Sequence, residues 1–313
     1  MRIAVLAGGV GAAKFLQGIA RIVSHEGLSC IVNTGDDIVL HGVHISPDLD
    51  IITYTLAGIV DYEKGWGRHK DTFNFLESIR SLGSDEWFRL GDKDLATHVY
   101  RTELLRSGPS LSQVTAILCK RLGVRSRVLP MSDDKFETWI KTDAGWMHFE
   151  EYYVRRGYRD EVRGIQFRGA ESAHPAPGVL ETIRESDLVI IAPSNPIVSI
   201  GTILAVHGIR EELRRRDKPV VAISPIVAGS PLKGPADKLM RYHGVQISPI
   251  GVAELYKDFL DLLIVDVADK ELIGDIASTG IKAVATNTIM KTMKDRIRLA
   301  KFTLASAKNL CYS

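Results

Sequence analysis

The sequence predicts a doubly wound α/β fold: a Rossmann-like, mostly parallel sheet with a helical segment and a small antiparallel β insertion. Two observations support it, an opening βαβ unit and the return of the same alternation later in the chain. The apolar run "RIAVLA" at residues 2–7 ends in Gly8-Gly9, as a strand buried on both faces would. "AAKFLQGIARIVSHEG" follows with apolar residues at helical spacing, and "LSCIVNTG" at residues 28–35 is typical of a second strand. This order requires a parallel sheet.

The second half of the chain repeats the alternation of apolar strands and amphipathic helices. A long amphipathic helix, "MKDRIRLAKFTLA", is predicted near the end of the chain. The expected order before it is helix 177–186, strand 187–196, helix 199–217, strand 218–227, helix 235–244, strand 261–269, helix 270–278 and strand 281–288.

Between the two halves the pattern changes. Residues 61–125 are predicted to be mostly helical, whereas "FETWIKTDAGWMHFEEYYV" alternates apolar and polar residues around an Asp-Ala-Gly turn, which indicates a β-hairpin. "VRGIQFRG" is expected to add a third strand. We therefore divide the chain into a first part of the Rossmann-like core with its helical segment (1–134), a small antiparallel insertion (135–175), and a second part of the core with the C-terminal helix (176–313).

Composition indicates a globular enzyme, since 45% of the 313 residues are hydrophobic and 25% are charged. The net charge of +2 is too small to favour non-specific nucleic-acid binding. Cys30, Cys119 and Cys311 have no C-x-x-C spacing, so neither a zinc site nor a disulfide framework is expected. No apolar run suits a secretory leader or a membrane span. We expect a cytoplasmic protein that binds neither nucleic acid nor membrane.

The turn "GGVGAAKF" is the first candidate ligand site. Gly8, Gly9 and Gly11 would let the backbone approach a phosphate, and the following helix offers its positive N-terminal end. Lys14, expected in the first helical turn, opposes the helix dipole and is best explained by a nearby anion. The third glycine of G-x-G-x-x-G and the G-K-[ST] of a P-loop are both missing, which disfavours a nicotinamide dehydrogenase. The alternative is a tight turn without a ligand.

Residues 31–50, "IVNTGDDIVLHGVHISPDLD", hold four aspartates and no lysine or arginine. Asn33 to Asp37 follow the second strand, at the sheet edge where ligands collect in open α/β folds. Mg²⁺ suits such a set, because it takes one or two carboxylates together with substrate phosphates. The alternative assigns Asp36 to a turn and makes Asp48 or Asp50 a helix N-cap.

Three further loops carry candidate contacts. In "WFRLGDKDLATHVYRTELL", Arg89 follows two aromatic residues and could stack on a flat ring while meeting a phosphate or carbonyl. His98 is interpreted as structural and Lys93 as part of a solvated face. "APSNPIVSIG" and "SPIVAGSPLKGPADKLM" each end a strand and begin a helix, where free N–H groups can hold an anion. With the glycine turn at the same edge, they indicate a ligand that carries a diphosphate.

Taken together, "AGGVGAAKF", "NTGDD", "SPDLD", "WFRLGDKDLATH", "LPMSDD", "APSNPIVSIG" and "SPIVAGSPLKGPADKLM" resemble the 2-phospho-L-lactate transferases of coenzyme F-420 biosynthesis, in order and from Ile3 to about Lys291. The resemblance implies transfer of a phospholactyl group from lactyl-2-diphospho-5′-guanosine to the ribityl hydroxyl of the deazaflavin alcohol Fo, with release of GMP and use of Mg²⁺. The donor could equally carry an enolpyruvyl or glyceryl group. A homodimer is also implied.

The same resemblance implies roles for individual residues. Asp50 and Arg89 would meet Fo, with Asn33 and Trp87 beside them. Asp50 is the first candidate and Asp37 the second for the catalytic proton acceptor, and the same two are the candidate Mg²⁺ ligands. The expected contacts of the guanosine diphosphate are Gly8, Gly9, Gly11, Lys14, Ser194, Asn195, Pro196, Lys233 and Gly234.

The main alternative is a non-enzymatic nucleotide-sugar-binding regulator of the gluconeogenesis-factor type, which shares the glycine turn, "NTGDD" and the Rossmann-like core. The segment "WFRLGDKDLATHVYRT" favours the transferase, because it supplies a site for a flat acceptor.

Overall fold

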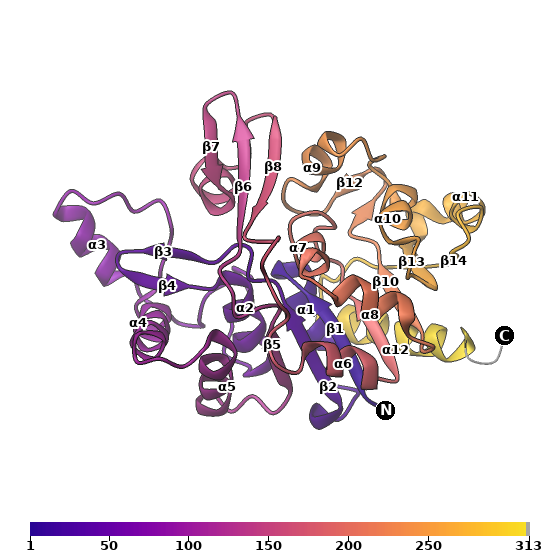
Figure 1. Ribbon diagram of the computed structural model, residues 1–313, viewed down its shortest axis with the longest axis horizontal. Coiled ribbons are helices and arrows are strands. Elements are labelled where there is room, and N and C mark those ends of the chain that lie inside the picture. The colour runs from indigo at the N-terminus through magenta and orange to yellow at the C-terminus, as the bar shows by residue number, and fades with distance from the viewer. Residues whose placement is uncertain (311–313) are drawn as a thin grey trace.

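A seven-stranded, all-parallel sheet forms the centre of the computed structural model, which describes residues 1–310 (Figure 1). Its strand order is β14-β13-β10-β9-β1-β2-β5. The chain builds β1, β2 and β5 outward on one side, then returns to place β9 on the other side of β1, so the topological switch point lies between β1 and β9. The predicted doubly wound fold is confirmed. The strands are β1 (Ile3–Ala7), β2 (Leu28–Val32), β5 (Arg127–Pro130), β9 (Leu188–Ile191), β10 (Val220–Ile223), β13 (Leu262–Asp266) and β14 (Lys282–Thr286).

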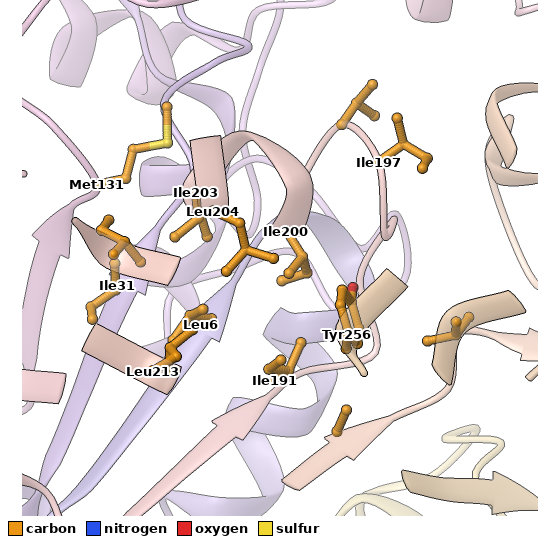
Figure 2. Close-up of a cluster of buried hydrophobic side chains, with 14 of the residues drawn as sticks. Leu6, Ile31, Met131, Ile191, Ile197, Ile200, Ile203, Leu204, Leu213 and Tyr256 are labelled. Atoms are coloured by element: carbon orange, nitrogen blue, oxygen red, sulfur yellow. The ribbon is translucent and has the colours of Figure 1, made fainter. Parts of the chain in front are cut away.

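Both faces of this sheet are covered by helices, which explains the uninterrupted apolar runs. Within β1, Ile3 and Val5 pack into one hydrophobic cluster, whereas Ala4 and Leu6 pack into the cluster on the opposite face. Figure 2 shows part of the second cluster, where Leu6 lies among side chains from β9 and from the helices that cover this face. The helices that contribute to the first cluster, around Ile3 and Val5, include α1 (Gly9–Ile19), α2 (Pro47–Leu56), α5 (Leu111–Arg121) and α12 (Met293–Leu310). Those that contribute to the second cluster, around Ala4 and Leu6, include α6 (Val179–Glu185), α7 (Ile200–Ala205), α8 (Ile209–Arg215), α9 (Ala236–Tyr242), α10 (Pro249–Tyr256) and α11 (Ile273–Ala277).

The predicted hairpin and third strand form a separate antiparallel sheet of order β7-β6-β8, made of β6 (Glu137–Thr142), β7 (Gly145–His148) and β8 (Gly164–Arg168). It projects from the top of the molecule in Figure 1. After β7 the chain turns into a short π-helix, η2 (Glu151–Arg155). Apolar side chains of this insertion, including Phe136 and Tyr152, join the hydrophobic cluster of the main sheet. The insertion is therefore anchored to the core.

Some predicted helices are wrong in extent. The helix expected at 199–217 is two, α7 and α8, because the chain breaks before Gly208, which has a left-handed φ of 84°. α1 starts at Gly9, so Lys14 lies beyond its first turn and not within it. Residues 61–73 are not helical, whereas α3 (Asn74–Ser81), α4 (Asp92–Arg106) and α5 are.

Several short elements were not predicted from the sequence. They are the edge strand β5, the hairpin β3 (Ile38–Leu40) and β4 (Val43–Ile45), the pair β11 (Ile226–Val227) and β12 (Ser230–Pro231), helix α10, and the short 3₁₀ helices η1 (His25–Gly27) and η3 (Val267–Leu272).

Residues 1–310 bear on two expectations from the sequence, the lack of a membrane span and the state of the cysteines. Across residues 1–310, no helix has the length and apolar character needed to cross a bilayer. Cys30 and Cys119 are buried free thiols, and burial raises the pKa of both, that of Cys119 to about 11. Cys311 lies outside the described residues.

Candidate active site

A cavity of about 690 Å³ opens at the carboxyl ends of β1, β9, β10 and β14. Its volume is typical of sites that bind small molecules. The loops after these four strands line it, together with parts of α1, α2, α4 and the insertion and with residues of the loops that precede α3 and α4. The cavity therefore lies at the switch point of the sheet, the place predicted for a ligand.

The glycine turn after β1 lies directly against the loop after β9. A Cβ atom on Gly11 would lie 2.1 Å from the carbonyl oxygen of Pro193, and one on Gly8 would lie 2.7 Å from the Cβ atom of Ser199. Gly9 has a φ of 71°, in the left-handed region. The N–H of Gly8 donates to Ser194 Oγ at 3.3 Å. These glycines are thus required for the two loops to meet at the cavity wall.

The carboxylate of Asp48 binds the first backbone N–H group of α1. Its Oδ1 atom accepts a hydrogen bond from the N–H of Gly9 at 2.7 Å, so a carboxylate of the protein itself meets the positive end of that helix. Burial raises the pKa of Asp48 to about 6, although hydrogen bonds from Asn33 and Gly9 oppose the shift. Neither Asp48 nor Asp50 caps α2, because the N-cap position is held by Ser46.

Asn33 connects the carboxylates beneath the cavity. Its Nδ2 atom donates to Asp36 Oδ2 and Asp48 Oδ2, both at 3.0 Å, and its Oδ1 atom accepts from the N–H of Gly35 at 2.8 Å and from Thr202 Oγ1 at 2.7 Å. Asn33 is fully buried and is not among the residues that line the cavity. In this structure it holds acidic side chains in place.

Of the two adjacent aspartates, Asp36 lines the cavity and Asp37 does not. Asp37 Oδ2 lies 2.9 Å from His44 Nε2 and accepts from Ser46 Oγ at 2.7 Å, which ties Asp37 to the β3–β4 hairpin and α2. The Oδ1 atoms of Asp36 and Asp37 are both buried without a hydrogen-bond partner in residues 1–310. Burial, and then the neighbouring Asp48, raise the pKa of Asp36 well above its ordinary value.

Asp50 lines the cavity from α2 and forms an ion pair with Arg101 of α4. One guanidinium nitrogen, Nη1, donates to Asp50 Oδ2 at 3.0 Å, and Nη2 donates to Oδ1. His98 Nδ1 lies 3.5 Å from Asp50 Oδ2. The Asp50 charge beside it raises the pKa of Arg101 although burial opposes this, so Arg101 stays charged.

Aromatic residues and Arg89 form another part of the cavity lining. Trp66, Phe88 and Arg89 line the cavity there. The Arg89 guanidinium lies 4.9 Å from the ring centroid of Phe73. Trp87 packs edge-on against Phe88 and does not itself line the cavity. This part of the lining therefore offers apolar ring faces together with a cation.

Lysines line the side of the cavity near the glycine turn. Lys14 and Lys233 both face it, and burial, followed by the charges of Arg296 and Lys233, lowers the pKa of Lys14. Crowded cations of this kind favour an anionic ligand. Of the other predicted diphosphate contacts, Gly8, Gly9, Gly11, Ser194, Asn195 and Gly234 line the cavity, whereas Pro196 does not.

Glu150 is a cavity residue that sequence analysis missed. It follows β7, is buried, and faces the acidic residues from the insertion side. Burial, and then the charges of Asp48 and Asp37, raise its pKa to about 8. Nothing in "HFEEYYV" separates Glu150 from its neighbour Glu151, so no sequence pattern could have found it.

Fold and cavity together define a Rossmann-like α/β protein with a candidate ligand site at the switch point, lined by lysines, acidic residues and aromatic rings. The family model of 2-phospho-L-lactate transferase CofD matches residues 3–303, and the chain belongs to this transferase family. The predicted family is confirmed, and the regulatory alternative is not favoured.

Similar proteins carry two different names. The chain is 44% identical to a phosphoenolpyruvate transferase of Kitasatospora aureofaciens, over 99% of each chain, and 44% identical to a 2-phospho-L-lactate transferase of Methanocaldococcus jannaschii, over 96% of each chain. A crystal structure of a UPF0052 family member from Bacillus halodurans superimposes with a TM-score of 0.62 at 15% identity, covering 97% of this chain and 100% of that one. At that identity the likeness supports the fold alone.

Proposed function

We propose that the protein moves the 2-phospholactyl group from lactyl-2-diphospho-5′-guanosine to the ribityl hydroxyl of Fo and releases GMP. The observation that carries the proposal is the mixed lining of one cavity. Glycine-turn backbone, Lys14 and Lys233 line it together with Asp50, Arg89 and aromatic rings. A diphosphate donor and a flat acceptor would thereby meet at one sheet edge.

The reaction is a phosphoryl-type substitution. The hydroxyl oxygen of Fo forms a bond to the phosphorus that carries the lactyl group, and the bond from that phosphorus to the bridging oxygen breaks, leaving its electron pair on GMP. Such reactions need alignment and charge neutralisation more than covalent help from the protein. Lys14 and Lys233 would neutralise the diphosphate, and Asp50 would accept the proton of the Fo hydroxyl.

Mg²⁺ is proposed at the acidic edge. Asp37 and Asp50 were the expected ligands, but Asp37 is held by His44 and Ser46, and both oxygens of Asp50 contact Arg101. Asp36 and Asp48 fit better, because both line the cavity, whereas Asp37 does not. Residues 1–310 contain no group of three or more metal-ligating side chains, which suits an ion that takes one or two carboxylates plus substrate phosphates. When bound, Mg²⁺ would offset negative charge on the phosphoryl oxygens.

The test is a turnover assay with Fo, Mg²⁺ and either the lactyl or the enolpyruvyl guanosine donor, followed by mass analysis of the product. We expect GMP and a phosphodiester of Fo with one of the two donors. The Asp50→Asn variant should form little product, whereas Asp217→Asn, which changes an exposed carboxylate outside the cavity, should behave as the wild type. No product from either donor with the wild type would refute the proposal.

Two further properties belong to the same proposal. GDP should bind to the unreacted protein, because it presents the diphosphate that the lysines and glycine turn would hold. We also propose a homodimer, on the family resemblance alone. Isothermal titration with GDP and light scattering after size exclusion test these two properties separately.

A further inference from the structure

Helix α4 presents three polar side chains at successive turns on one buried face. Asp94, His98 and Arg101 are 8%, 1% and 2% exposed. Charged side chains this deeply buried are costly unless they are paired and hydrogen-bonded. Asp94 and His98 line the cavity, and Arg101 lies behind Asp50. This polar face therefore borders the cavity at Asp50, the residue proposed to meet the acceptor.

The contacts form a chain that ends at Asp50. Arg101 Nη1 lies 3.1 Å from His98 Nδ1 while also donating to Asp50. A guanidinium has only donors, so His98 Nδ1 accepts, and the neutral ring carries its proton on Nε2. That Nε2 atom lies 3.3 Å from Asp94 Oδ1 but makes no hydrogen bond within residues 1–310, and Asp94 Oδ1 accepts a hydrogen bond from the Tyr54 hydroxyl at 2.6 Å. The contact with Arg101 therefore sets the tautomer of His98.

We propose that His98 and Arg101 are positioning residues that hold the Asp50 carboxylate in the orientation in which it meets the acceptor. The two-pronged contact of Arg101 fixes the plane of the carboxylate, as a lysine could not. His98 in turn fixes the guanidinium, whose Nε atom has no hydrogen-bond partner in the described part of the chain. The inference rests on the proposed role of Asp50 in acceptor binding.

Stability alone is a poor explanation of this face. Replacing a buried ion pair by apolar residues is often neutral or stabilising, so an α/β core does not need one here. The chain of contacts also runs from one cavity residue to another, from Asp94 through His98 and Arg101 to Asp50. An arrangement that holds a ligand-facing carboxylate accounts for both features.

Two nearly isosteric substitutions separate the two ring nitrogens. His98→Asn keeps an oxygen near the Nδ1 position, where it can accept from Arg101, whereas His98→Gln moves the amide toward the Nε2 position. We expect His98→Asn to keep a KM for Fo within about threefold of the wild type and His98→Gln to raise it about tenfold or more, equivalent to about 1.4 kcal/mol. Arg101→Lys should lower kcat/KM for Fo by a similar factor or more. The dissociation constant for GDP should stay unchanged in all three.

Steady-state kinetics with varied Fo, GDP titration and thermal unfolding decide the outcome. The inference would be overturned if His98→Asn and His98→Gln had the same Fo kinetics, or if the variants lost GDP affinity as strongly as they lost Fo affinity. Either result would leave the proposed function standing. Failure of the proposed function is distinct, because the wild type would then give no product with any guanosine donor. A Fo KM that rises in His98→Gln without loss of melting temperature supports positioning.

Discussion

The close approach of the two cavity loops makes Gly11 the most informative single position. A Cβ on Gly11 would lie 2.1 Å from the Pro193 carbonyl oxygen, whereas ordinary contacts begin at 3.4 Å. In Gly11→Ala the β9 loop or α1 must therefore retreat by roughly 1 Å, at a cost of about 1–3 kcal/mol. Alanine gains about 1 kcal/mol over glycine within a helix, which offsets part of this cost. We expect a net loss of up to about 2 kcal/mol and about tenfold weaker GDP binding.

Gly274→Ala is the matched control. Gly274 lies in α11, and a Cβ there would meet nothing within 4 Å. This variant should gain up to about 1 kcal/mol and bind GDP as the wild type does. Urea unfolding and GDP titration measure both quantities. If Gly11→Ala were as stable as Gly274→Ala and bound GDP equally well, the contact between the loops and its link to the ligand would both be refuted.

Three other predictions concern the cavity walls. Asp50→Asn should fold and bind GDP yet lose at least about a hundredfold in kcat/KM for Fo, and near-normal turnover would remove Asp50 from the reaction. Arg89→Ala should raise the KM for Fo about tenfold while GDP affinity stays the same, and an unchanged KM would exclude Arg89 from the acceptor site. Folded Glu150 keeps its proton up to about pH 8, against 4.5 in the unfolded chain, so its contribution to stability falls as pH rises between these values. Glu150→Gln should therefore lose less stability than the wild type between pH 5 and 8 in urea unfolding with a chelator, and parallel curves would contradict this.

The parallel core was predictable because its strands are buried on both faces. "RIAVLA" and "DLVIIAPSNP" are apolar without alternation, and each precedes a turn and a helical pattern. Short or edge elements were not predictable in the same way. β5 contributes only four residues and ends at Pro130, and α10 has eight, too few to show a period. The break between α7 and α8 combines an extended Val206 with a left-handed Gly208, and the surrounding helical pattern conceals both.

The sequence located the site but did not determine which side chains face it. Asp36 and Asp37 are adjacent and chemically identical, and only tertiary contacts with the β3–β4 hairpin turn Asp37 away. Asp48 looked like a possible cap of its own helix, but it contacts the first amide of α1. Glu150 reaches the cavity from the insertion. Each of these placements depends on contacts between residues far apart in the chain, and local patterns do not record such contacts.

A crystal structure grown with GDP, Mg²⁺ and Fo would test the central claim most directly. The diphosphate should lie beside the glycine turn, within reach of Lys14 or Lys233, and the deazaflavin ring in the same cavity next to Asp50 and Arg89. Either ligand bound outside this cavity, with the acidic residues facing only solvent, would contradict it.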